Sequence, residues 1–556
     1  MSLALLAILF LTLLFFAYHY YGKRIAKELR LYSQNLTPAH TFRDDIDFVP
    51  TKPFYLFGQH FSAIAAAGPI AGPIIACQQF GWLACLFWIG LGVVFIGAVH
   101  DFSTLVASLR HEASSVADIA RVRISKKAGN AMMIFIWITL IYIIVAFADI
   151  TASSFVSVIE EIQGIPITFN AGGAVAVASI LYLLVALLLG VVQRLWKLPM
   201  WLLCITFVPL AFTVSYLGTH VSYFFILKQN QWAFLILVYC ACASMLPVWL
   251  LLQPRGFLGG FILYFALAVG IIGIFVGDFT IKQPYFRGFS VGGDTGTLFP
   301  FLFVTIACGA CSGFHGLVCS GTTSKQIDKE SHARPIGYGG MLAEAFVAFI
   351  ALSIVMMMSD ADIQGLKPGT IYGNGIGQFL SLIIGKQNLP FAITLGAMAF
   401  STFVFDTLDV ATRLGRYIFQ ELVGWKSGVG ALVGTVITVL IPGFIVTSTE
   451  SGSWVKFWTL FGASNQLLAA LSLLGVSMWL YQARRRITFT LIPMLFVLTM
   501  TFWALISLFI SNLRSSQGFN LSLINALASL TLILLAVFII GSALRKVMKI
   551  RAGPIQ

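Results

Sequence analysis

The chain has 556 residues, of which 59% are hydrophobic and only 10% are charged. Soluble proteins carry about 25% charged residues, so this composition excludes a soluble protein and indicates one that crosses a membrane many times. The formal net charge of +13 does not indicate nucleic-acid binding, because the basic residues are scattered over separate loops between apolar stretches.

The apolar stretches are about 20 residues long, the length that crosses a bilayer core. We expect an all-α integral membrane protein with about 15 transmembrane helices, near residues 2–21, 58–80, 82–109, 131–159, 172–192, 199–227, 231–252, 257–277, 298–321, 338–358, 389–411, 428–446, 457–481, 487–511 and 521–544. The polar stretches near 22–57 and 359–388 are too short to fold alone, so we expect no enzyme.

The basic residues predict the topology. The first apolar stretch is followed directly by GKRIAKELR, which indicates a retained helix with its N-terminus outside and not a cleaved signal peptide. If the spans then alternate, only seven of the 34 Lys and Arg lie outside: Lys228, Lys282, Arg287, Lys367, Lys386, Lys456 and Arg514. The rest, Arg255 among them, lie in inside loops, as the positive-inside rule requires. We expect an inner (cytoplasmic) membrane protein with its C-terminus in the cytoplasm.

Two spans have a composition that is unusual for a continuous helix. The span at 58–80 contains two Gly-Pro pairs, Gly68-Pro69 and Gly72-Pro73. Proline removes a backbone donor and clashes one turn back, so we expect this helix to break near its centre. The span at 298–321 is loosened by four glycines and ends at SGTTS.

The two unusual spans occupy matching places in the chain. Each is followed by a further span and then by one with an acid in mid-membrane, Asp149 in the first set and Asp406 and Asp409 in the second. Broken helices at corresponding positions in two halves mark the binding site of an inverted-repeat transporter. We therefore divide the chain into an N-terminal helix and cytoplasmic loop (1–57), a first half (58–227), two inserted helices (231–277), a second half (298–481), and two C-terminal helices with a tail (487–556).

Several long motifs carry a resemblance to a known family. They are DDIDFVPTKPFYLFGQHFSAIAAAGPIAGP, GAVHDF, ACGACSGFHGLVCSGTTSKQIDKESHARPIGYGGMLAEAFVA, DTLDVATRLGRYIFQEL and LFGASNQLLAA. In this order, from about residue 40 to 480, they resemble the carbon starvation protein A (CstA) family. The resemblance implies the amino acid–polyamine–organocation superfamily, with a LeuT-like 5+5 inverted repeat that is extended here by extra helices. It also implies secondary active transport: peptide uptake induced in carbon starvation or, in some branches, proton-coupled pyruvate uptake.

We expect the substrate, a short peptide or pyruvate, to bind at the two breaks. The candidate residues are Gly68, Pro69, Gly72, Pro73, Gly313, Phe314, His315 and Asn465. A half-helix N-terminus exposes backbone N–H groups and a dipole that attract an anion, and both substrates carry a carboxylate. Asn465 and Gln466 could bond either to the substrate or to another helix, and both alternatives stay open. His315 could have a functional role or be a core histidine whose hydrogen bonds are satisfied.

The candidates for ion coupling are His60, Asp101, Asp406, Asp409, Ser401 and Thr402. An ionisable residue inside a membrane is a functional candidate by default, and histidine, with an ordinary pKa of about 6.5, suits proton transfer. The hydroxyl groups would instead suit Na⁺, which is the alternative to H⁺. Because successive helical residues point about 100° apart, we expect His100 and Asp101 to face different neighbours, and we place Glu344 near Arg334.

The segment ACGACSGFHGLVCSGTTSK allows a different interpretation. Cys308, Cys311, His315 and Cys319 share one stripe of a helix, and zinc prefers thiolate and imidazole ligands. In a continuous helix, however, Cys308 and Cys319 stand about 16 Å apart along the axis, too far to share one ion. We therefore expect packing thiols, no bound metal and no cofactor. The alternatives are a metal-dependent membrane protein that uses Cys308, Cys311 and His315, and a channel.

Overall fold

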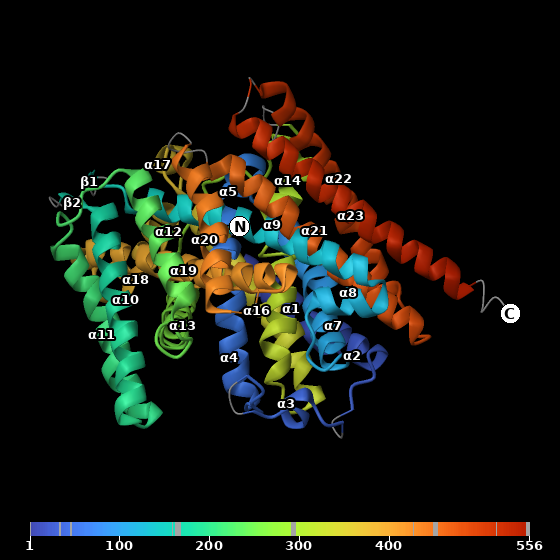
Figure 1. The fold of residues 1–556 in the computed structure, drawn as a ribbon. Helices are drawn as coiled ribbons and strands as arrows, with labels where there is room; N and C mark the ends of the chain where they lie inside the picture. The colour runs from blue at the N-terminus through green and yellow to red at the C-terminus, as the bar shows by residue number, and fades with distance from the viewer. Residues whose placement is uncertain are drawn as a thin grey trace.

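The computed structural model describes residues 2–32, 35–44, 47–157, 159–161, 168–290, 296–425, 427–448, 454–516, 518 and 520–551. Nearly all of its regular structure is α-helical (Figure 1). The helices α10 and α11 lie at one side of the molecule and α22 and α23 at the other, with the broken helices between them (Figure 1). The short strands β1 (Ile159–Glu161) and β2 (Thr168–Asn170) form one antiparallel pair.

Twelve helical segments among the described residues are long and apolar enough to cross a membrane. They are Leu3–Glu28 (α1, η1 and α2), Trp82–Leu109 (α6, η2 and α7, with α7 at Ala98–Leu109), Lys126–Phe155 (α9), Ala171–Trp196 (α10), Met200–His220 (α11), Leu252–Val276 (α13), Glu330–Met356 (ending in α16, Gly339–Met356), Lys386–Val423 (ending in α19, Leu389–Val423), Gly428–Thr447 (α20), Val455–Gln482 (in α21, Trp454–Gln482), Thr488–Ser515 (α22) and Leu521–Arg551 (α23). The other helices named below are α4 (Pro53–Ile64), α5 (Gly68–Phe80), α12 (Gln229–Met245), α14 (Leu298–Thr305), α15 (Gly313–Gly321) and α18 (Pro368–Ile384).

The sequence predicted about 15 spans, whereas length and hydropathy identify twelve among the described residues. The bent pair α4–α5 makes a thirteenth if it is counted as one span. The remaining two expected spans correspond to α12, which has 17 residues, and to the pair α14 and α15, which have 8 and 9. A helix of 17 residues is at the short limit for crossing a bilayer core.

Helix α18 was not expected from the sequence, which predicted a polar loop over 359–388. The helix forms because its glycines allow a close approach to α19: a Cβ atom on Gly373 would lie 2.7 Å from Cβ of Ala397, and one on Gly377 would lie 2.6 Å from Cγ1 of Ile393. Such packing of small residues is a main source of helix association in membranes, and hydropathy alone does not register it.

The first break lies just before the two Gly-Pro pairs, at residues 65–67. Helix α4 ends at Ile64 and α5 begins at Gly68, with a bend of 43° between them. Pro69 stands in the first turn of α5, where a missing N–H costs nothing, and Pro73 is accommodated inside the helix. The pairs therefore start a helix after the break, and they do not each interrupt one.

The second break is a complete interruption. Residues 306–312 form turns and extended chain between α14 and α15. Cys308 and Cys311 lie in this unwound segment, so the stripe of three cysteines and a histidine expected on one helix does not exist. Its separation into two parts removes the geometric basis of the metal-dependent alternative.

The two breaks touch each other. A Cβ atom on Gly68 would collide with Sγ of Cys308, and one on Gly72 would lie 2.8 Å from the carbonyl oxygen of Thr305. Segments that are about 240 residues apart in the chain therefore meet closely, at Gly68 against the side chain of Cys308 and at Gly72 against the backbone of Thr305, and only glycine allows this approach.

The same close packing gives a test of how the second break is held. In α21, a Cβ atom on Gly462 would collide with the carbonyl oxygen of Val304 in α14, whereas one on Gly475 would meet its nearest neighbour, Cγ2 of Ile119, at 3.7 Å. We expect Gly462→Ala to lower the melting temperature of the purified protein, because overpacking costs about 1–3 kcal/mol. Gly475→Ala is the matched control and should leave the temperature unchanged or raise it. Equal melting temperatures would contradict this packing.

Candidate functional site

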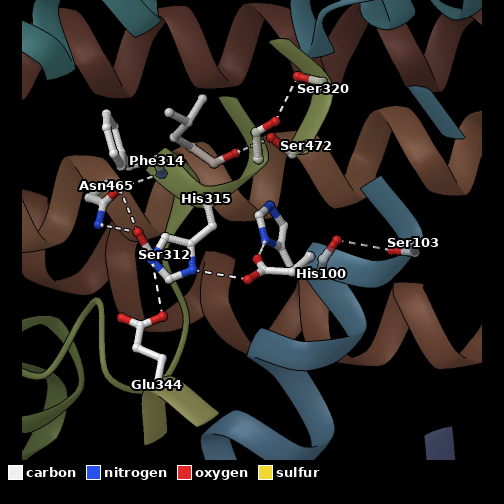
Figure 2. A network of polar contacts seen from close by, with 12 residues as sticks. His100, Ser103, Ser312, Phe314, His315, Ser320, Glu344, Asn465 and Ser472 are labelled. Atoms are coloured by element: carbon white, nitrogen blue, oxygen red, sulfur yellow. Dashed lines mark hydrogen bonds and ion pairs between the residues drawn. The ribbon is translucent and has the colours of Figure 1, made fainter. Parts of the chain in front are cut away.

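Two consecutive side chains of α21 hold the two sides of the second break. Oδ1 of Asn465 accepts a hydrogen bond of 2.8 Å from the N–H group of Phe314, at the start of α15, and its Nδ2 donates to Oγ of Ser312 at 3.0 Å (Figure 2). The next residue, Gln466, donates from Nε2 to the carbonyl oxygen of Phe303 in α14 at 2.8 Å. Both amides thus bond to the chain on either side of the break, which is one of the two alternatives left open for them.

Two tryptophans satisfy further backbone groups at the end of α14. Nε1 of Trp458 donates to the carbonyl oxygen of Thr305, and Nε1 of Trp88 to that of Ile306, each at 3.1 Å. A buried carbonyl group without a partner is costly where no water reaches. At the start of α15, the N–H group of Phe314 is likewise bonded, to Asn465.

His315 lies between two carboxylates. Its Nδ1 is 3.0 Å from Oδ2 of Asp101 in α7, and its Nε2 is 3.3 Å from Oε2 of Glu344 in α16. The second oxygen of Asp101, Oδ1, is 2.7 Å from Nδ1 of His100. Figure 2 shows these contacts. All four side chains are at most 1% exposed, and we call the series Glu344–His315–Asp101–His100 the histidine–carboxylate chain.

Two expectations about the residues of the histidine–carboxylate chain are wrong. His100 and Asp101 were expected to face different neighbours, but the carboxylate uses one oxygen for each of two imidazoles and so contacts His100 as well as His315. Glu344 was placed near Arg334, but Glu344 pairs with His315. The guanidinium of Arg334 lies over the ring of Tyr18 at 4.7 Å instead.

Some polar atoms near the histidine–carboxylate chain have bonding capacity left. Among the described residues, Nε2 of His100, Oε1 of Glu344 and Nε2 of His60 are buried without a hydrogen-bonding partner. The other nitrogen of His60, Nδ1, is 2.9 Å from Oγ1 of Thr323. An unsatisfied buried polar atom lowers stability by about 1–3 kcal/mol. A proton or a substrate group that forms a hydrogen bond with one of these atoms would remove that cost.

A second buried cluster surrounds Arg255. This arginine stands in the first turn of α13 and is completely buried. Its Nε is 3.2 Å from Oδ1 of Asp406, its Nη1 pairs with Oδ2 of Asp409, and its Nη2 donates to the carbonyl oxygen of Thr402 at 3.2 Å. The hydroxyl group of Tyr239 also donates to Oδ2 of Asp409, at 2.8 Å.

The placement of Arg255 corrects the sequence analysis, which put it in an inside loop. A single arginine between two apolar runs looks like a loop residue, yet this one neutralises two mid-membrane acids. The signal for it was available: Asp406 and Asp409, one turn apart on α19, needed a cation.

Five of the six ion-coupling candidates thus fall into two groups, and Ser401 stands apart from both. His60 and Asp101 belong to the surroundings of His315, while Asp406, Asp409 and Thr402 surround Arg255. Oγ of Ser401 is 2.7 Å from Oγ of Ser179 in α10. Asp149 belongs to neither group, because its Oδ1 accepts from Nε2 of Gln229 at 2.6 Å.

The cysteines take no part in a cluster of ligands. All eight are free, and among the described residues no group of three or more His, Cys, Asp or Glu is arranged to hold a metal ion. Sγ of Cys308 instead lies 3.5 Å from Nδ2 of Asn465. The metal-dependent alternative is therefore not favoured.

Comparison with known proteins points to transport. The model of the family described as carbon starvation protein CstA matches residues 2–374 and 363–504. The peptide transporter CstA of Bacillus subtilis (strain 168) is 30% identical, over 98% of this chain and 97% of its own length. The pyruvate/proton symporter BtsT of Escherichia coli (strain K12) is 29% identical, over 90% of this chain and 81% of its own. A solved manganese transporter of Eremococcus coleocola covers 89% of this chain and 95% of its own, at 15% identity and a TM-score of 0.43, a likeness on which no argument rests.

The Arg255 cluster gives a test by charge balance. Arg255→Gln would leave the buried carboxylate of Asp409 and the partly exposed one of Asp406 without their cation, and breaking a buried ion pair from one side costs about 3–5 kcal/mol. We expect a fall of several degrees in the melting temperature of the purified protein. The double variant Arg255→Gln with Asp409→Asn removes one of the stranded charges and should recover part of the loss, since Asp406 is 17% exposed. A double variant as unstable as the single one would contradict an ion pair.

Proposed function

Because this chain belongs to the carbon starvation protein CstA family, we propose that it is a secondary active transporter that imports short peptides across the cytoplasmic membrane, driven by protons. The observation that carries this proposal is the histidine–carboxylate chain at the second break. It brings proton-binding groups into contact with a helix interruption of the kind at which membrane transporters bind substrate.

His315 is the proposed proton carrier. A positive imidazolium is stabilised by Asp101 on one side and by Glu344 on the other, at 3.0 Å and 3.3 Å. Without that proton, two carboxylates would face one neutral ring in an apolar interior, where unbalanced charge is expensive. Binding or release of a single proton therefore changes the charge balance between the imidazole and the two carboxylates. Such a change is needed to couple proton movement to substrate transport.

The substrate carboxylate is proposed to bind at the start of α5. This helix N-terminus follows the first break, and its dipole favours an anion. The proposed binding residues Gly68, Pro69, Gly72, Pro73, Gly313, Phe314, His315 and Asn465 are all buried, so the site is closed in this structure and substrate access requires movement.

We also propose that the contact between the two breaks reflects a LeuT-like inverted repeat formed by residues 58–227 and 298–481, with the N-terminus outside. The meeting of Gly68 with Cys308 and of Gly72 with Thr305 supports this arrangement. Asp406, Asp409, Ser401 and Thr402 would then provide a second ion-responsive region, and Na⁺ at the hydroxyl groups is the alternative coupling ion.

A second candidate function is proton-coupled uptake of pyruvate or another small carboxylate. It is favoured by the relative named as a pyruvate/proton symporter. Pyruvate and a peptide each carry a carboxylate that the start of α5 would bind, so both functions use the same proposed site. They differ in how much space the rest of the substrate needs beside that carboxylate.

Uptake by proteoliposomes separates these candidates. We expect labelled di- and tripeptides to accumulate when the outside is acidic, and uptake to fall to the leak level when an ionophore removes the proton gradient. Faster accumulation of pyruvate than of any peptide would move the function to the second candidate. Accumulation that needs external Na⁺ and ignores the proton gradient would contradict proton coupling.

The role of His315 is tested by His315→Gln, which keeps a hydrogen-bonding group but does not titrate near neutral pH. We expect uphill uptake to fall at least tenfold, while exchange of internal for external substrate, which moves no net proton, falls much less. His220→Gln, at an exposed histidine at the end of α11, is the matched control and should retain both activities. Normal accumulation by His315→Gln would transfer the proton to another group.

A further inference from the structure

A cavity of about 390 Å³ lies between the N-terminal span and α22, away from both breaks. Its polar side is formed by Tyr21, Arg24 and Glu28 of the N-terminal span and by Arg486 and Thr488 at the start of α22. Its apolar side includes Ile25, Phe95 and Phe489. The cavity is therefore amphipathic, because its lining includes two guanidinium groups as well as aromatic and aliphatic side chains.

The region around this cavity is strongly basic. It gathers two segments that are more than 450 residues apart in the chain, and their basic residues are Lys23, Arg24, Lys27, Arg30, Arg484, Arg485 and Arg486. The segments are joined where Nη1 of Arg485 donates to the carbonyl oxygen of Leu29 at 3.1 Å. Such a concentration of one sign of charge attracts anions.

The acidic groups nearby do not balance this charge. Oε1 of Glu28 is 3.4 Å from Nη1 of Arg486, an exposed pair that is worth little. Glu330 pairs with Arg110 at 2.7 Å. Among the described residues, Arg24 has no acidic partner within ion-pair distance, so it remains available to a ligand that enters the cavity.

The apolar side of the cavity opens onto the surface that faces the membrane. The ring of Phe95 packs edge-on against that of Tyr21, with 5.2 Å between centroids, and is itself 46% exposed. Ile492, which lines the cavity from α22, is 66% exposed. On a helix that crosses a bilayer, side chains this exposed and this apolar contact lipid chains.

We propose that this cavity binds the headgroup of an anionic phospholipid, with its phosphate between Arg24 and Arg486 and an acyl chain along Phe95 and Ile492. Basic pockets at the membrane surface between transmembrane helices recognise such headgroups. A soluble phosphate would use the arginines but would gain nothing from the apolar side, so the combination of the two selects a lipid.

The proposal is tested by lipid binding to the full chain in detergent. Native mass spectrometry would compare phosphatidylglycerol with phosphatidylcholine of the same acyl chains. We expect tighter binding of phosphatidylglycerol, and a loss of at least tenfold in Arg24→Gln with Arg486→Gln, since each basic residue contributes about fivefold. The matched control, Lys23→Gln with Arg484→Gln, removes the same charge from exposed residues that do not line the cavity and should lose less than threefold.

The opposite change, Glu28→Gln, frees Arg486 and should strengthen the binding of phosphatidylglycerol. The proposal is overturned if both lipids bind equally, or if the two double variants lose the same affinity. It is also overturned if inorganic phosphate binds lipid-free protein as tightly as phosphatidylglycerol does, which would make this a site for soluble anions.

Discussion

Backbone groups at a broken helix must find partners inside the protein, because the bilayer interior provides none. At the second break the partners are side chains: Gln466, Trp458 and Trp88 donate to three carbonyl groups at the end of α14, and Asn465 accepts from α15. The rest of the centre depends on this arrangement. With α15 fixed in this way, His315 reaches Asp101 on one side and Glu344 on the other.

The two buried polar clusters have different chemical characters. The Arg255 cluster contains a guanidinium, which keeps its charge at any physiological pH, so its balance with Asp406 and Asp409 is permanent. The histidine–carboxylate chain contains only groups that gain and lose protons, and it retains unpaired atoms on His100 and Glu344. The first cluster thus suits a structural role that fixes α13 against α19, and the second suits a changing charge.

The sequence predicts the membrane class, the two helix breaks and most of the ionisable residues near them, because hydropathy, Gly-Pro pairs and buried charges are local signals. The partners of those residues are not local. Asp101 and His315 are 214 positions apart, and Arg255 and Asp409 are 154 apart, so a buried charge signals that it needs a partner but its spacing does not identify which residue that partner is. Helix α18 was missed for a related reason: its apolar residues are interrupted by glycines and polar side chains in the sequence PGTIYGNGIGQFLSLII, and its glycine contacts with α19 are not visible in the sequence.

Asn465 and Gln466 are neighbours on one continuous helix, yet they bind opposite sides of an interruption. Helix α21 therefore holds the two half-helices α14 and α15 in fixed positions relative to each other. If α15 tilts alone, the hydrogen bonds of Asn465 break, and if α14 tilts alone, the hydrogen bond of Gln466 breaks. The two half-helices and α21 are thus fastened into one mechanical unit. On the function proposed above, the movement that opens the site would take place at the other interruption, where α4 and α5 meet at an angle of 43°, and this break would act as the hinge.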